Sequence, residues 1–169
     1  MTFNELVALF EAYTGTEGEV EEAQLAMWFN EAQLDLAYDM GSVVCWEPAG
    51  GTSYDVPEDC LRIIDSTGDY TISPDNKILL DTEGTVLYYF KTPTPFTGAD
   101  QDQESELNKA LHTLLAMFAA SRYFDQESEG DTEESNHATK WMSYYLQGKN
   151  TARTKLQTAF VQLDKWRVL

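Results

Sequence analysis

Histidine is the side chain most often used as a catalytic base near neutral pH, and this chain contains only two histidines. His112 follows Leu111 in an apolar stretch with helical spacing, which favours a core or interface position over a catalytic base. His137 follows an acidic segment and is expected in the first turn of a helix. The chain contains no nucleophile elbow, Walker loop, dinucleotide-binding glycine loop or HExxH motif. We therefore expect a protein that is not an enzyme and that uses no cofactor.

An acidic segment, DQESEGDTEE, runs from residue 125 to residue 134 and is the best candidate for a metal site. Alternate positions carry carboxylates around Gly130, as in a calcium-binding EF-hand loop. The match fails at the twelfth position, where Asn136 replaces the bidentate carboxylate. We expect a solvated loop between two helices and no metal site, with weak divalent-cation binding as the alternative. The residues of this candidate acidic loop are Asp125, Glu127, Glu129, Asp131, Glu133 and Glu134.

Charge is unevenly distributed along the 169 residues. The formal net charge is −18, but residues 1–136 carry a net −23 and residues 137–169 a net +5. The overall charge opposes broad, non-specific binding to DNA or to anionic membranes, because both are polyanions. Hydrophobic residues make up 43% of the chain and aromatic residues 12%, which indicates a folded domain rather than a disordered acidic tail.

The basic C-terminal arm, residues 149–169, is the second candidate site. It is either a solvated helix that complements the acidic body, or an arm that docks on an acidic partner or on a neighbouring copy. Trp166 favours docking, because Trp and Arg are enriched at interface hot spots; a Trp that closes the protein's own core is the alternative. The candidate docking residues are Lys149, Arg153, Lys155, Lys165, Trp166, Arg167, Val168 and Leu169.

Hydrophobic periodicity predicts the helices that would position these residues. Phe3, Leu6 and Phe10 share one helical face behind a capping box formed by Thr2 and Glu5. Gly148 and Asn150 are expected to kink or break the last helix before the arm. The expected helices are at about residues 2–13, 20–40, 103–124 and 134–147.

The segment from residue 43 to residue 96 has a different character, because short β-prone runs alternate with Gly, Pro and Asn. No helix-length pattern lies between these runs, so we expect antiparallel pairing. The expected strands are at residues 43–46, 53–56, 61–66, 70–72, 77–81 and 86–91. The predicted fold is mainly helical α+β: a helical bundle with a small antiparallel β lobe inserted between its second and third helices. Residues 1–148 would form a single domain, followed by the arm.

Cysteine content and the N-terminal sequence indicate the compartment. Cys45 and Cys60 are too few for a disulfide scaffold, so free thiols are expected, with a bridge between neighbouring strands as the alternative. The N-terminus lacks the basic and apolar regions of a signal peptide, and no stretch approaches the roughly 20 apolar residues of a membrane span. We expect a soluble protein that is made in the cytosol.

Four short motifs follow one another within residues 20–146. They are W-F-N-E-A-Q-L-D-L-A (28–37), G-G-T-S-Y-D-V-P-E-D-C-L-R-I (50–63), V-L-Y-Y-F-K-T-P-T-P-F (86–96) and A-L-H-T-L-L-A-M-F-A-A-S-R-Y-F (110–124). Their order resembles the head–tail adaptor (connector, or head-completion) proteins of tailed bacteriophages. In that family L-N-E-A-Q, Y-x-L-P-x-D, a Y-x-x-x-P strand end and an apolar helix succeed one another. Val56 stands where leucine is usual, and the acidic loop and basic arm match no family motif.

The resemblance implies a structural protein of the virion, made in the host cytoplasm and located in the neck between head and tail. Such adaptors form a ring, commonly of twelve copies, that joins the portal protein of the capsid to a tail or stopper protein. DNA passes through the channel without specific binding, and a channel wall that is partly acidic would keep DNA from adhering. The C-terminal segment commonly reaches the portal, so the arm is expected to dock there, and no membrane is involved.

The charge also fits a protein of another class. An acidic interaction or inhibitor protein that mimics DNA would occupy a basic cleft on a host protein. That alternative requires carboxylates arranged in rows like those of a DNA duplex.

Overall fold

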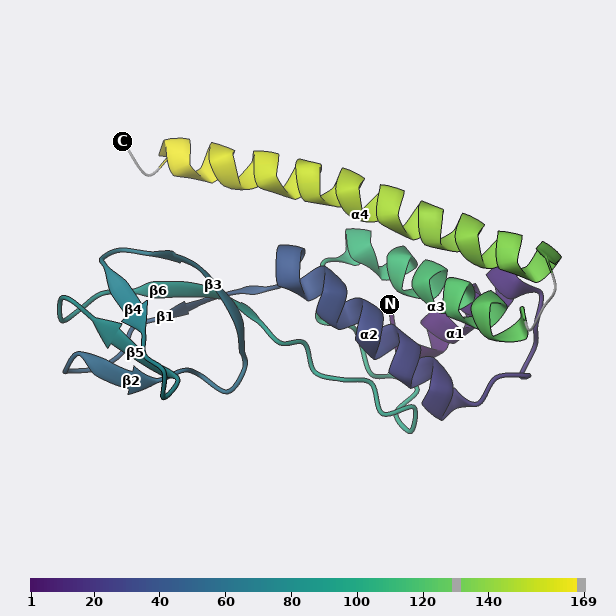
Figure 1. The fold of residues 1–169 in the computed structure, drawn as a ribbon, viewed down its shortest axis with the longest axis horizontal. Coiled ribbons are helices and arrows are strands. Elements are labelled where there is room, and N and C mark those ends of the chain that lie inside the picture. Colours follow the sequence, from purple (N-terminus) through teal and green to yellow (C-terminus); the bar gives the residue numbers. More distant parts are fainter. Residues whose placement is uncertain (129–131, 167–169) are drawn as a thin grey trace. The chain divides into compact units, whose positions relative to one another are not determined.

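Within the described residues, 1–128 and 132–166, four α-helices and six short strands follow one another, and all the strands lie between the second and third helices (Figure 1). In this computed structural model the side chains of residues 157–166 are not described. The helices are α1 (Phe3–Thr14), α2 (Glu22–Met40), α3 (His112–Glu127) and α4 (Thr132–Trp166), with a 3-10 helix η1 (Lys109–Leu111) before α3. The predicted mainly helical α+β fold is confirmed. Among these residues, no helix combines the length and hydropathy of a membrane-spanning segment.

The chain divides into two compact units. The helical unit comprises residues 1–36 and 94–169, and the β unit comprises residues 37–93. The last turn of α2 belongs to the β unit, and α2 ends at Met40, directly before Gly41.

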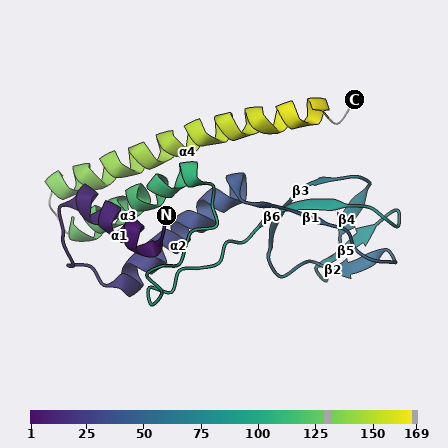
Figure 2. The ribbon, with the colours of Figure 1, turned by 180° about the vertical axis from the view of Figure 1, so that it is seen from behind.

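The helical unit is built around α3, whose neighbours are α1 and α4 (Figure 2). The predicted capping box begins α1, because the Thr2 hydroxyl accepts a hydrogen bond from the Glu5 amide and the Glu5 carboxylate accepts one from the Thr2 amide. Burial of apolar side chains from the four helices stabilises the unit. The core includes Phe3, Leu6, Phe10, Leu25, Phe29, Ala32, Leu36, Leu111, Leu115, Phe118 and Tyr145.

The helix predicted to begin near residue 103 begins later, at η1. Residues 101–104 instead run beside the start of α1: the Phe3 amide donates to the Gln103 carbonyl at 2.9 Å, and the Asn4 amide donates to the Gln101 carbonyl at 3.1 Å. These carbonyls satisfy amides in the first turn of α1 that have no partner within the helix. Asn108 then caps η1, since its side chain accepts from the Ala110 amide at 3.0 Å.

The break predicted at Gly148 is absent, because α4 continues through this residue to Trp166. Gly148 faces Leu114 of α3, and a Cβ atom at residue 148 would lie 2.4 Å from Leu114 Cδ2. The glycine thus permits a close approach of two helices, at a cost of about 1 kcal/mol in helix propensity relative to alanine.

Residues 37–93, all of which are described, contain two three-stranded antiparallel sheets. The strand order is β1 (Val43–Trp46), β6 (Leu87–Lys91), β3 (Cys60–Ser66) in one sheet and β2 (Ser53–Asp55), β5 (Lys77–Leu80), β4 (Tyr70–Ile72) in the other. The predicted antiparallel pairing is confirmed. Cys45 and Cys60 are free thiols. They lie on β1 and β3, which β6 separates, so the alternative prediction of a disulfide between neighbouring strands is wrong.

Two features hold the β unit together. Ile78, Leu80 and Leu87 form its buried core. Arg62 of β3 lies 4.8 Å from the ring centroid of Tyr38 and 3.9 Å from the Asp39 carboxylate, and so fixes the last turn of α2 to the sheet.

Candidate functional site

His112 is buried, at 3% exposure, as predicted from the sequence. Its Nδ1 lies 2.7 Å from the amino group of Met1, and its Nε2 lies 2.8 Å from the Leu107 carbonyl oxygen. An ammonium group can only donate, so these contacts favour a neutral ring with its proton on Nε2. Burial lowers the pKa of His112 below its ordinary value of 6.5, and the Met1 amino group lowers it further. Both ring nitrogens are therefore occupied by structural contacts.

His137 lies in the second turn of α4 rather than the first, because α4 begins at Thr132. Its side chain is exposed, and its ring meets that of Phe124 edge to face at 5.1 Å. This contact belongs to the packing of α3 against α4.

The acidic loop is shorter than predicted, because α3 extends to Glu127 and α4 begins at Thr132. Asp125 and Glu127 therefore lie on α3, and Glu133 and Glu134 lie in the first turn of α4. Carboxylates in the first turn of a helix interact favourably with the positive end of the helix dipole. Glu129 and Asp131 lie outside the described residues. Across residues 1–128 and 132–166, no group of three or more His, Cys, Asp or Glu side chains is arranged to hold a metal ion.

The basic arm is a continuation of α4. Lys149, its first residue, contacts the helical unit: its Nζ lies 2.7 Å from Asp35 Oδ1 of α2. Arg153 and Lys155 are exposed and make no ion pair with any residue that the structure describes. The side chains of Lys165 and Trp166, and all of Arg167, Val168 and Leu169, lie outside the described residues.

The polar residues of the N-E-A-Q motif find partners within the chain. The Asn30 side chain accepts from the Phe96 amide at 2.8 Å and donates to the Phe96 carbonyl at 2.9 Å. Buried Gln33 donates to Asn30 at 3.2 Å and accepts from the Ser105 hydroxyl at 2.9 Å. These bonds fix the segment after β6 against the middle of α2.

The Y-D-V-P-E-D motif is fixed in the same way within the β unit. Tyr89 of β6 donates its hydroxyl to Asp59 at 2.9 Å, and the Thr92 amide donates to the Asp59 carbonyl at 2.8 Å. Burial and the bond to the Asp59 carboxylate raise the pKa of Tyr89 to about 12. In both units, residues of one resembling motif bind residues of another.

A groove of about 820 Å³ lies between α3 and α4. Arg122 and Asp125 line its α3 side, and Met142 and Leu146 line its α4 side. Leu146 is 50% exposed. We call these four residues the groove flank.

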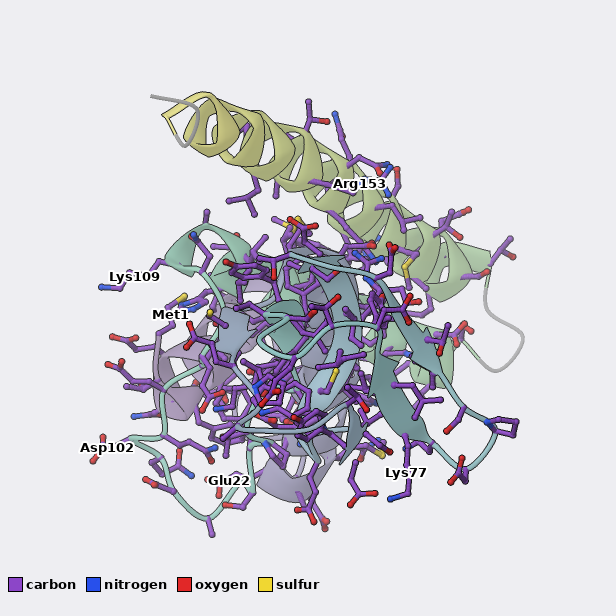
Figure 3. The ribbon with its side chains drawn as sticks, turned by 90° about the vertical axis from the view of Figure 1, so that its left-hand side faces the viewer. Met1, Glu22, Lys77, Asp102, Lys109 and Arg153 are labelled. Carbon is purple, nitrogen blue, oxygen red and sulfur yellow. The ribbon has the colours of Figure 1, made fainter. Side chains whose placement is uncertain are left out.

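A smaller hollow of about 420 Å³ lies beside α2 and is lined in part by Met27, Leu34 and Phe96. Between Met27 and Leu34 on the same helix, Glu31 binds Arg122 at 3.1 Å. This ion pair connects α2 with the groove flank. The Glu31 carboxylate therefore neutralises the Arg122 guanidinium, whereas Glu22 and Asp102 point their carboxylates toward solvent elsewhere on the helical unit (Figure 3).

Sequence reasoning missed the groove, although a signal for it exists. No acidic side chain occurs between residues 135 and 163. Within that stretch, uncharged polar residues recur every four positions and form one row on α4. They are Ser135, Thr139, Ser143, Gln147 and Thr151.

No protein-family model matches this chain, and no curated protein matches it in sequence. Its function is therefore inferred from its own residues and contacts.

Proposed function

We propose that this protein is a structural component of a phage virion: a head–tail adaptor that joins the capsid portal to a tail or stopper protein. In this proposal, copies of the chain form a ring in the neck, and the genome passes through its channel. The observation that carries the proposal is that the motifs resembling the adaptor family bind one another. Asn30 binds Phe96 in the helical unit, and Asp59 binds Tyr89 and Thr92 in the β unit.

These contacts support a structural role, because the motif residues with functional groups are used to hold loops in place. Asn30 and Gln33 satisfy backbone and side-chain groups of residues 96–105. A catalytic site would instead leave polar groups aimed into a shared cleft. Hydrogen bonds that hold loops in place are expected of a ring subunit, because its loops must keep one shape in every copy.

The charge division supports the same proposal. An acidic channel wall would repel the DNA backbone, so the genome would slide past without adhering. Arg153 and Lys155, which carry no ion pair in the described part of the chain, are available to an acidic surface on the portal. The proposed partners are therefore the portal protein at the basic arm and a tail or stopper protein at another surface.

The portal-docking part of this proposal is tested with capsids that carry a portal but lack this protein. A chain without Trp166–Leu169, and a chain with Arg153→Glu and Lys155→Glu, should bind at most about a tenth as many copies per capsid as the intact chain. Lys109→Glu is the matched control, because Lys109 is an exposed cation outside the arm (Figure 3). Copies per capsid are counted by quantitative mass spectrometry. Full loading of the shortened chain would refute docking through the arm.

A further inference from the structure

The two sides of α4 differ in chemistry. Trp141 stacks on Tyr13 of α1 with ring centroids 4.6 Å apart and meets Tyr144 edge to face at 5.7 Å. Lys140 Nζ lies 5.9 Å from the centroid of the Tyr144 ring. Tyr144 is 44% exposed, although it is a large aromatic side chain. We call Tyr13, Lys140, Trp141 and Tyr144 the aromatic flank.

The aromatic flank and the groove flank face different directions. Tyr144 and Leu146 are two residues apart on α4, so their side chains are about 200° apart around the helix axis. Tyr144 lies on the side that carries the contact with α1, and Leu146 lies on the side that lines the groove with α3. An exposed aromatic side chain on one side and a groove on the other allow copies to associate head to tail, and such contacts close into rings when the rotation permits.

We propose that the aromatic flank of one copy docks into the groove flank of a second copy of this chain. The proposal rests on the proposed function for the existence of a ring, and it adds the surfaces through which neighbouring subunits meet. Tyr144 is the anchor that enters the groove between Met142 and Leu146 of the next copy. Lys140 then faces Asp125 at the groove's other wall.

Charge identifies a second copy as the occupant. Copies with a net charge of −18 repel one another over most of their surface. The two flanks are exceptions: the groove's Arg122 is paired with Glu31 at 3.1 Å, and the aromatic flank carries the cation of Lys140. Asp125 and Lys140 make no ion pair within the part of the chain that the structure describes, so each is available to the other across the contact.

Residue types also favour this contact. Tyr and Trp are enriched at interface hot spots, and interface cores are poor in charge. The groove supplies that core, because Met142 and Leu146 stand beside an uncharged polar row that includes Thr139 and Ser143.

Disulfide trapping tests the contact in the full chain. In a Cys45→Ser/Cys60→Ser background, Asn136→Cys, at an exposed position about one turn before Lys140, marks the aromatic flank and leaves Lys140 and Tyr144 in place. Thr139→Cys or Asn150→Cys marks the groove. A chain with the first substitution is mixed with a chain carrying one of the others, under mild oxidation and at both 0.15 and 0.5 M salt to vary charge screening. We expect at least about tenfold more mixed disulfide than for Asn136→Cys mixed with Lys109→Cys, an exposed site outside both flanks. A yield no higher than this control, both between free chains and on portal-bearing capsids, would overturn the proposal. A dominant disulfide between two Asn136→Cys chains would also overturn it, because it would indicate a symmetric contact.

A charge exchange gives an independent readout. Lys140→Glu should lower trapping between Asn136→Cys and Thr139→Cys chains about tenfold when placed on the Asn136→Cys chain, and Asp125→Lys on the Thr139→Cys chain should restore it. No restoration would contradict the Lys140–Asp125 contact. If rings load on capsids but no mixed disulfide forms, this interface fails and the adaptor proposal stands. If the disulfide forms but the chain never loads, the adaptor proposal fails and the interface stands.

Discussion

The side chain of Asn30 forms two hydrogen bonds with the backbone of Phe96: it accepts one from the amide at 2.8 Å and donates one to the carbonyl at 2.9 Å. The two residues are 66 positions apart, and the β unit lies between them in sequence. Asn30 therefore fixes where the chain re-enters the helical unit. The Phe96 ring, 5.5 Å from that of Phe3 and 6.3 Å from that of Phe29, is held in the core by the same arrangement.

Asn30→Ala should lower the free energy of unfolding by about 2–4 kcal/mol, because it leaves the amide and carbonyl of Phe96 without their partners. Asn30→Asp is the matched control, since it retains an acceptor for the amide and loses only the donor to the carbonyl. We expect its loss to lie between zero and that of the alanine variant. Urea denaturation measures both, and equal losses would contradict a two-sided contact.

Tyr145 and Asp35 provide the corresponding contact between α4 and α2. The Tyr145 hydroxyl donates to the Asp35 carboxylate, which also binds Lys149. Tyr145 is 1% exposed. Tyr145→Phe should cost about 2 kcal/mol, because it removes a hydrogen bond to a charged group. Tyr144→Phe, at the exposed neighbouring position, should change stability by less than about 0.5 kcal/mol. Equal effects of the two variants in urea denaturation would show that the hydroxyl of Tyr145 contributes nothing.

Gly148→Ala tests the close approach of α4 to α3. The added Cβ would overlap Leu114 Cδ2 at 2.4 Å, so we expect a net loss of about 1 kcal/mol even though alanine favours helices. Asn150→Ala, at an exposed position on the same helix, should cause no loss. A double-mutant cycle is decisive: Leu114→Ala should cost about 3 kcal/mol alone and at least about 1 kcal/mol less when Gly148→Ala is also present. Strict additivity would show that the two residues do not contact.

His112 should make stability depend on pH in a defined direction. Its pKa is lower in the folded chain than the ordinary 6.5, so near and below pH 6.5 the unfolded chain binds more protons than the folded one. Stability contributed by neutral His112 is therefore complete above pH 6.5 and is lost as the pH falls toward the folded pKa. His112→Gln removes this dependence and keeps a side chain that can bond to Leu107. Between pH 7.5 and 5, wild type should lose stability relative to this variant in urea denaturation. A constant difference across that range would contradict a lowered pKa.

The strands were predictable from sequence to within about a residue, because Gly50, Gly51, Pro57 and Gly68 separate the β-prone runs. The capping box of Thr2 and Glu5 was equally local. The start of the third helix was not predictable, since no Gly or Pro separates residue 103 from the apolar stripe that begins at Leu107. Only the backbone bonds between residues 101–104 and α1 show that this segment is a loop.

Tertiary contacts also explain what sequence reasoning missed in the candidate sites. Gly148 looks like a helix breaker until Leu114 is placed against it, because helix propensity cannot show a close approach. The polar side chains of Asn30 and Gln33 clearly needed partners, but a backbone carbonyl has no sequence signature. The acid-free stretch from residue 135 to residue 163 was visible as a charge pattern, whereas the groove beside it needs α3 as its second wall.

The most direct test of the adaptor proposal is the mass and copy number of the particle that contains this protein, measured free by native mass spectrometry and on capsids by electron microscopy. The proposal predicts a ring of about twelve copies, either in solution or at the portal vertex, since a ring can be stabilised by the portal on which it assembles. A persistent monomer that is absent from capsids and binds a basic host protein one to one would contradict it and favour a DNA mimic.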